Sequence, residues 1–169
     1  MSDPLRPLRV DALELLRRPG AEREIAVVVA PADLDVAHPA LDGSIAVEYR
    51  LESLHDGIAL RGTVHTPWAA ACRRCLRELT DVDHTAVDEL YQCELTDPDA
   101  YVIEQDRLDL VPVTRETALL ALDDERLCAA DCAGLCPSCG IDRNVATCAC
   151  DLTRRDERWA VLDELRVDE

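Results

Sequence analysis

"SIAVEYRLESLHDGIALRGTVHTPW", residues 44–68, decides the fold class, because it contains two strand patterns on either side of one turn signal. From Ile45 to Leu51, residues that suit a core alternate with mostly polar ones, which is the period of a strand with one buried face. His55-Asp56-Gly57 follows, and an Asp-Gly pair accepts the positive φ angles of a tight hairpin turn. Residues 58–68 have the pattern of a returning strand. The stretch therefore predicts an antiparallel β-hairpin.

The flanking segments extend this hairpin into an α+β fold. Residues 24–30 contain the apolar run IAVVVA and predict another strand, and residues 80–93 are expected to be extended. A short helix is predicted over residues 10–18, ended by Pro-Gly, and a second over residues 114–122, with Thr114 placed to cap it. We expect an antiparallel β-sheet or partial barrel with few helices and, because Cys136 and Cys139 have C-x2-C spacing, a zinc-knuckle C-terminal segment.

A change of composition suggests two parts. Residues 1–125 are expected to form a β-rich domain that carries the first cysteine knuckle, the C-x2-C stretch at 72–75. Residues 128–150 contain Gly134, Pro137 and Gly140 without any periodicity, so they cannot build a conventional core. A helix is predicted after them, over residues 153–166. We therefore expect residues 126–169 to be a cysteine-rich zinc-binding segment with a C-terminal helix, packed on the first domain.

The first thirty residues predict a reducing compartment. Their apolar run is far shorter than a signal sequence or a membrane span, so we expect a cytoplasmic protein with no membrane partner. In that setting, nine cysteines are expected to be metal ligands or catalytic thiols rather than disulfides. The odd number also excludes complete pairing within one chain.

The spacing of the cysteines predicts metal binding. Two C-x2-C knuckles, at 72–75 and 136–139, have the spacing at which one turn holds two thiolates on a tetrahedral ion. Two further pairs stand at 128 and 132 and at 148 and 150, which makes enough thiols for two structural zinc ions. The candidate ligands are Cys72, Cys75, Cys128, Cys132, Cys136, Cys139, Cys148 and Cys150. Cys93 is left over.

Two groupings of these ligands are open. In the first, the four cysteines at 136–150 close a local site, and the 72–75 knuckle binds with the pair at 128 and 132, leaving Gly134 as a hinge. In the second, the two knuckles share one ion. Short loops cost less entropy to close, which favours the first. His65 and His84 flank the first knuckle and are candidate substitute ligands or supporting groups. A closed four-cysteine site has no open coordination position, so it activates no water.

The charge of the chain is strongly negative and uneven. The formal net charge is −17, and residues 76–125 contain 15 acidic residues against 3 arginines. Such a segment repels phosphates, whereas proteins that bind bare duplexes usually carry the opposite sign. Two interpretations fit it: a solvated surface that keeps the protein soluble, or a docking face for a basic protein.

Several segments together resemble one known family. They are CRRCL at 72–76, DLVPVTRETALLAL at 109–122, LCAADCAGLCPSCGIDRN at 127–144, CAC at 148–150 and RDERWAVLDEL at 155–165. In this combination and order the chain resembles the YceD-like proteins, also called large ribosomal RNA subunit accumulation proteins. The resemblance implies a cytoplasmic bacterial or organellar factor that supports accumulation of large-subunit ribosomal RNA, with no established enzymatic activity. Some members lack the cysteines matching those at 136–150, which again favours the first grouping.

The leading hypothesis is a non-enzymatic ribosome-biogenesis factor. Its expected partner is a large ribosomal subunit precursor or a basic ribosomal protein. A minority surface could contact ribosomal RNA, and its candidate residues are Arg73, Arg74, Arg154, Arg155 and Arg158. The alternative is a direct RNA-binding zinc module. A thiol oxidoreductase is the third hypothesis, and it requires an accessible cysteine of low pKa.

Overall fold

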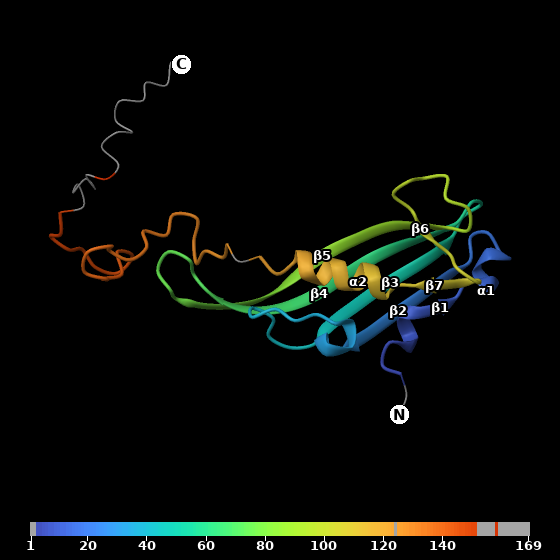
Figure 1. Ribbon diagram of the computed structural model, residues 1–169, viewed down its shortest axis with the longest axis horizontal. Helices are drawn as coiled ribbons and strands as arrows, with labels where there is room; N and C mark the ends of the chain where they lie inside the picture. Colours follow the sequence, from blue (N-terminus) through green and yellow to red (C-terminus); the bar gives the residue numbers. More distant parts are fainter. Residues whose placement is uncertain (1–2, 124, 152–157, 159–169) are drawn as a thin grey trace, which may run out of the picture. The chain divides into compact units, whose positions relative to one another are not determined.

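An open five-stranded sheet is the largest element of the computed structural model, which describes residues 3–123, 125–151 and 158 (Figure 1). The strand order is β2-β3-β4-β5-β6, in which β2–β3 and β3–β4 are antiparallel and β5–β6 is parallel. The strands are β2 Glu22–Val29, β3 Ile45–Ser53, β4 Ile58–Ala71, β5 Glu78–Gln92 and β6 Tyr101–Val102. The expected α+β class, mostly antiparallel strands with few helices, is confirmed. The short β6 makes the sheet mixed.

The chain divides into two compact units. The first, which we call the β unit, comprises Met1–Ala70 and Glu78–Glu125. The second, the cysteine unit, comprises Ala71–Arg77 and Arg126–Glu169. The helix predicted over residues 153–166 lies almost wholly outside the described residues. Within the described residues, no helix has the length and apolar character needed to cross a membrane.

The predicted hairpin is confirmed, although its turn differs from the expectation. Ser53 pairs with Ile58, and the N–H of Leu54 donates to the carbonyl of Gly57 at 2.8 Å. None of the residues 55–57 has a positive φ angle, so the primed turn was wrong. Gly57 is required for another reason: a Cβ atom there would lie 2.3 Å from the carbonyl oxygen of Tyr91. Close packing against β5 therefore explains this glycine.

Short elements complete the β unit. A second sheet pairs β1 Arg9–Asp11 with β7 Arg107–Asp109, and the helical segments are η1 Arg6–Leu8, α1 Leu13–Leu16, η2 Pro31–Leu34 and α2 Val111–Leu120. The first predicted helix was too long, because Val10 lies in β1 opposite Leu108. This pairing partner is almost one hundred residues away in the sequence, so no local pattern indicates it.

Helix α2 begins three residues earlier than predicted, and Thr114 does not cap it. Pro112 lies in its first turn, where a missing N–H costs nothing. Thr114 is buried, its hydroxyl oxygen lies 2.6 Å from the carbonyl oxygen of Leu110, to which it donates, and 3.0 Å from the hydroxyl of Tyr49. These contacts satisfy the polar groups that link α2 to β3. Burial raises the pKa of Tyr49 to about 12.

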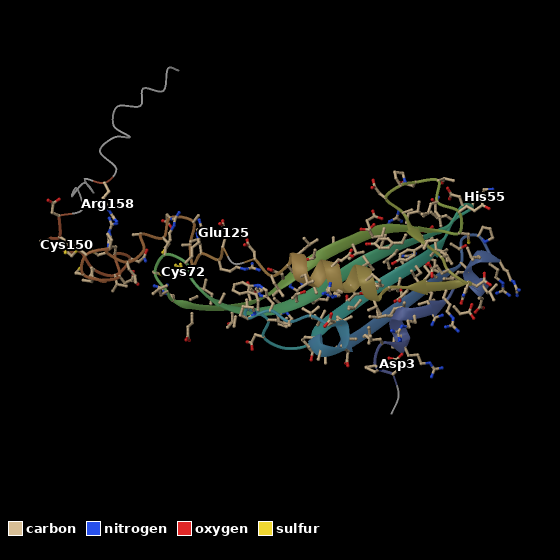
Figure 2. The ribbon with its side chains drawn as sticks, viewed as in Figure 1. Asp3, His55, Cys72, Glu125, Cys150 and Arg158 are labelled. Atoms are coloured by element: carbon tan, nitrogen blue, oxygen red, sulfur yellow. The ribbon has the colours of Figure 1, made fainter. Side chains whose placement is uncertain are left out.

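One hydrophobic cluster fills the β unit. Aliphatic side chains from both sheets and from α2 supply most of it, with Tyr49, Tyr91 and Trp68 as the aromatic members. Figure 2 shows the side chains of the strands and of α2 as sticks. This arrangement leaves the other face of the sheet to charged pairs such as Arg61 with Asp88, at 3.2 Å. The core of the described chain therefore lies on one side of the five-stranded sheet.

Candidate metal centre

The cysteine unit buries sulfur rather than hydrocarbon. Among its described residues, the buried ones are Cys72, Cys75, Cys132, Cys136 and Gly134. No aliphatic side chain in this part of the structure is buried. A segment of this kind cannot offset the entropy of folding by apolar burial, so another source of stabilisation is required.

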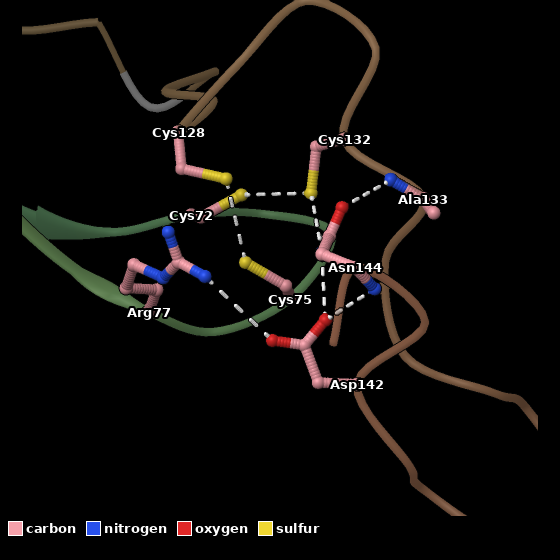
Figure 3. Close-up of polar contacts among 8 residues, drawn as sticks. All are labelled: Cys72, Cys75, Arg77, Cys128, Cys132, Ala133, Asp142 and Asn144. Atoms are coloured by element: carbon pink, nitrogen blue, oxygen red, sulfur yellow. Dashed lines mark hydrogen bonds and ion pairs between the residues drawn. The ribbon is translucent and has the colours of Figure 1, made fainter. Parts of the chain in front are cut away.

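Four of the predicted ligands form one cluster, the first tetrad. The sulfur atoms of Cys72, Cys75, Cys128 and Cys132 all lie within 4.8 Å of one another. The Sγ atoms of Cys72 and Cys132 are 3.9 Å apart, and those of Cys75 and Cys128 are 3.6 Å apart (Figure 3). Thiolates bound to one tetrahedral zinc ion lie roughly 3.8 Å apart. The spacing therefore suits a metal ion at the centre of the four sulfurs.

The other four predicted ligands form the second tetrad. The sulfur atoms of Cys136, Cys139, Cys148 and Cys150 also lie within 4.8 Å of one another, and Cys139 is exposed. The structure thus brings the cysteines together as in the first of the two groupings, and the two C-x2-C knuckles lie in different tetrads. Cys93 belongs to the β unit and to neither tetrad.

The two knuckles fold into the same turn. In each, the N–H of the first cysteine donates to the carbonyl five residues later, and its own carbonyl accepts from the N–H four residues later. These bonds, each 2.8 Å, are Cys72 N to Arg77 O, Leu76 N to Cys72 O, Cys136 N to Ile141 O and Gly140 N to Cys136 O. The residue after the second cysteine is left-handed in both, with φ of 60° at Leu76 and 75° at Gly140. Neither knuckle begins a helix, as a thioredoxin-like motif would.

The thiols of the first tetrad differ in acidity. Backbone N–H groups, that of Cys75 first, lower the pKa of Cys72 to about 6. Hydrogen bonding with Cys132 and Cys75 instead raises the pKa of Cys128 to about 12. One thiolate therefore forms easily while a neighbouring thiol resists ionisation. A divalent cation among the four sulfurs would offset the repulsion between neighbouring thiolates.

The second tetrad shows the same contrast. The backbone N–H of Cys139, with that of Ser138, lowers the pKa of Cys136 to about 6. Contact with Cys139 raises the pKa of Cys150 to about 12. Both tetrads therefore offer four sulfur donors, and a soft divalent ion would neutralise the charge of their thiolates.

Asn144 supports the first tetrad, although its sequence position lies in the loop of the second. Its side-chain N–H donates to the sulfur of Cys132 at 3.4 Å, and its carbonyl oxygen accepts from the N–H of Ala133 at 2.8 Å (Figure 3). Asp142 fixes Asn144 by accepting from its backbone and side-chain N–H groups at 2.9 and 2.7 Å, and lies 3.9 Å from Arg77. Asn144 was not among the predicted site residues, although Asp-x-Asn is a turn signal that could have indicated it.

Arg74 and Gly134 connect the first knuckle to the loop that follows Cys132. The guanidinium of Arg74 donates to the carbonyls of Ala130 and Cys132 at 3.3 and 3.1 Å. Its own carbonyl accepts from the N–H of Leu135 at 2.9 Å. Gly134 has φ of +70°, and a Cβ atom there would lie 3.0 Å from the Arg74 carbonyl. Gly134 is therefore a close-packed position between the two groups of cysteines, and a role as a hinge stays a prediction.

The two histidines considered as substitute ligands belong to the β unit. The Nδ1 atoms of His65 and His84 lie 2.6 Å apart, so the two rings share one hydrogen bond. In the described part of the chain, both groups that could hold a metal ion consist of cysteines alone.

Comparison with known proteins agrees with the family resemblance. Residues 60–166 match the family described as "Large ribosomal RNA subunit accumulation protein YceD". An uncharacterised protein of Mycobacterium tuberculosis is 31% identical, with the match covering 94% of this chain and 81% of that protein. An uncharacterised protein of Mycobacterium leprae is 26% identical over 94% of this chain and 77% of its own length. No solved structure matches the chain.

Proposed function

The chain belongs to the YceD family of large ribosomal RNA subunit accumulation proteins, and we propose that it is a non-enzymatic, cytoplasmic ribosome-biogenesis factor. In this proposal the β unit binds a basic ribosomal protein or a large-subunit precursor that contains one. The cysteine unit is a scaffold held by two structural zinc ions. The family description supports the role in ribosomal RNA accumulation. The distribution of charge supports the partner, and the two cysteine tetrads support the metal.

The distribution of charge carries the proposal. The β unit contains 26 of the 35 acidic residues and 9 of the 18 arginines, so it holds the whole net charge of −17. The cysteine unit has equal numbers of acidic residues and arginines. A surface of one sign accelerates encounter with a partner of the opposite sign and repels RNA phosphates. The β unit therefore suits a basic protein better than bare RNA.

The chemistry of the donor set supports zinc in both tetrads. Four thiolates in a tetrahedral arrangement are the preferred ligands of structural zinc. Because all four positions would be filled by protein, such an ion binds no substrate and contributes its binding free energy to folding. The first tetrad would be formed by Cys72, Cys75, Cys128 and Cys132 and the second by Cys136, Cys139, Cys148 and Cys150.

Affinity purification tests the proposed function. The tagged chain, purified from its native cells at moderate salt, is expected to bring down large-subunit precursors or a basic ribosomal protein that cosediments with them. A preparation that contains neither would contradict the proposal. The chain carrying a different tag at the other terminus serves as the control for blocked access.

Direct RNA binding is the second candidate, and the arginines of the cysteine unit favour it. Arg154 and Arg155 lie outside the described residues, and Arg74 already donates to carbonyls of its own unit. Arg73→Glu tests this candidate, because it reverses a charge in the first knuckle and keeps the bonds of Arg74 in place. RNA binding predicts a loss of affinity in the variant and a steep salt dependence. No binding of ribosomal RNA fragments at low salt would exclude this candidate.

A further inference from the structure

Strand β5 has an open edge along most of its length. It has 15 residues, and β6 pairs only with Tyr91 and Gln92. In the described part of the chain, no backbone hydrogen bond reaches the outer side of residues 78–90. Unpaired N–H and C=O groups along a sheet edge are a template for a further strand.

A hydrogen bond of Gln92 shows which backbone groups of β5 point to the outer edge. The N–H of Ile103 donates to the carbonyl of Gln92 at 2.8 Å, so Gln92 faces the outer edge. In a regular strand, alternate residues direct their N–H and C=O groups to the same side. The even-numbered residues from Val82 to Leu90 therefore present their backbone groups outward, while the odd-numbered ones bond to β4.

This edge is accessible. Between Glu78 and Leu90, Val87 is the one buried residue, and most of the others are exposed. The β2 edge at the other end of the sheet, Glu22–Val29, ends in an apolar run and contains an arginine. The two edges of the same sheet therefore differ in charge, which makes β2 an internal control for β5.

The charge of β5 determines which occupant fits. The strand contains Glu78, Asp81, Asp83, Asp88 and Glu89, and it contains no arginine. Burial raises the pKa of Glu89, and the negative charges of Asp88, Glu116 and Asp99 raise it further, so carboxylates are concentrated at this end of the edge. A second copy of β5 would place like charges opposite one another, and a nucleic acid would bring phosphates. A cationic segment has neither cost.

We propose that the outer edge of β5 binds an extended, arginine- and lysine-rich segment of a partner protein as an added strand. Backbone hydrogen bonds to the even-numbered residues provide the affinity, and the carboxylates of β5 select basic side chains. The inference rests on the proposed function, because it names the surface of the β unit on which a basic ribosomal protein docks.

A synthetic peptide tests the edge directly. The probe is a twelve-residue peptide of alternating valine and lysine or arginine, and its matched control has the same sequence with every second backbone nitrogen methylated. Hydrogen exchange of the full chain is expected to slow in residues 82–90 on adding the probe, with no change in β2. Equal binding of the methylated peptide, or protection without any peptide as protein concentration rises, would overturn the proposal.

Substitutions in β5 sharpen the test. Ala86→Pro removes one outward N–H and leaves the bonds to β4, and it is expected to weaken peptide binding about tenfold, while Ala86→Ser keeps the N–H and the affinity. If the proline variant does not fold, Asp81→Asn with Glu89→Gln provides the second test, with an expected loss of both affinity and salt dependence. Unchanged binding in the charge variant contradicts the choice of a basic segment.

The two proposals fail in different ways. If the probe protects β5 but no ribosomal component is purified with the chain, the edge is correct and the proposed function is wrong. If ribosomal precursors are purified with the chain but neither they nor the probe protect residues 82–90, the function stands and the edge is wrong.

Discussion

The β unit buries 25 apolar side chains in one cluster, whereas the buried residues of the described cysteine unit are four cysteines and one glycine. Apolar burial can stabilise the first unit, whereas the second buries too little hydrocarbon to be stabilised in this way. The two units also differ in charge, because the β unit holds the whole net charge of the chain. We therefore expect one unit to depend on its core and the other on metal.

Metal removal should have the largest effect and should separate the two units. A strong chelator is expected to abolish the protection from hydrogen exchange of residues 126–151, since a structural zinc ion supplies about 10–16 kcal/mol of apparent folding energy in small peptides. The amides of β3 and β4 should keep theirs. Hydrogen exchange with mass spectrometry measures both in one sample, and protection that survives in the cysteine unit would contradict the dependence on metal.

Loss of a buried ligand should remove one ion. Cys72→Ser takes a thiolate from the centre of the first tetrad and is expected to lower the metal content from two ions per chain to one, because the remaining donors leave an incomplete site. Cys93→Ser is the matched control, since Cys93 lies in neither tetrad, and it should retain both ions. If both variants bind the same amount of metal, the ligand assignment is wrong.

A packing change in the β unit should lower the stability of the chain and leave its metal content unchanged. Gly57→Ala places a methyl group 2.3 Å from the Tyr91 carbonyl, so the chain must shift, at an expected cost of about 2–4 kcal/mol in the free energy of unfolding. The metal content should stay the same. Thermal denaturation measures the first quantity and metal analysis the second, and a fall in metal content would show that the units are not independent.

The amide of Asn144 should affect the rate of metal release. Asn144→Ala removes the hydrogen bond to the sulfur of Cys132, and such supporting contacts are worth about 10–100-fold in metal affinity. Transfer of zinc to a coloured chelator is therefore expected to become faster from one of the two sites. Val145→Ala changes an exposed neighbour and is the control. Equal rates in the two variants would assign Asn144 no role.

The smallest effects should come from the matched turn positions of the two knuckles. Leu76 and Gly140 both have left-handed backbones, which cost a non-glycine residue about 1–2 kcal/mol. Leu76→Gly is expected to slow metal release slightly and Gly140→Ala to accelerate it. Effects of the same sign would show that the two turns are not equivalent.

The sequence indicated those features that depend on local spacing. Alternation from Ile45 to Leu51 predicted β3, and the cysteine spacings indicated eight thiols that the structure brings together in two groups of four. Features that need a distant partner and carry no spacing signal could not be predicted. Val10 lies in a strand because Leu108 pairs with it, and the buried hydroxyl of Thr114 has Tyr49 as a hydrogen-bond partner.

The supporting contacts of the tetrads depend on the same kind of distant pairing. Asn144 reaches Cys132 across the loop of the other tetrad, and Gly134 is fixed by a carbonyl from the first knuckle. No spacing rule relates these positions. Ligands can therefore be predicted from spacing, whereas the residues that orient them become visible once the chain is folded.

Native mass spectrometry of the purified chain, combined with alkylation of free thiols, would show whether metal holds the two tetrads together. We expect two zinc ions per chain, with Cys93 as the one thiol that reacts before a chelator is added. A chain that contains no metal, with the cysteines of the tetrads reactive or paired as disulfides, would contradict this expectation.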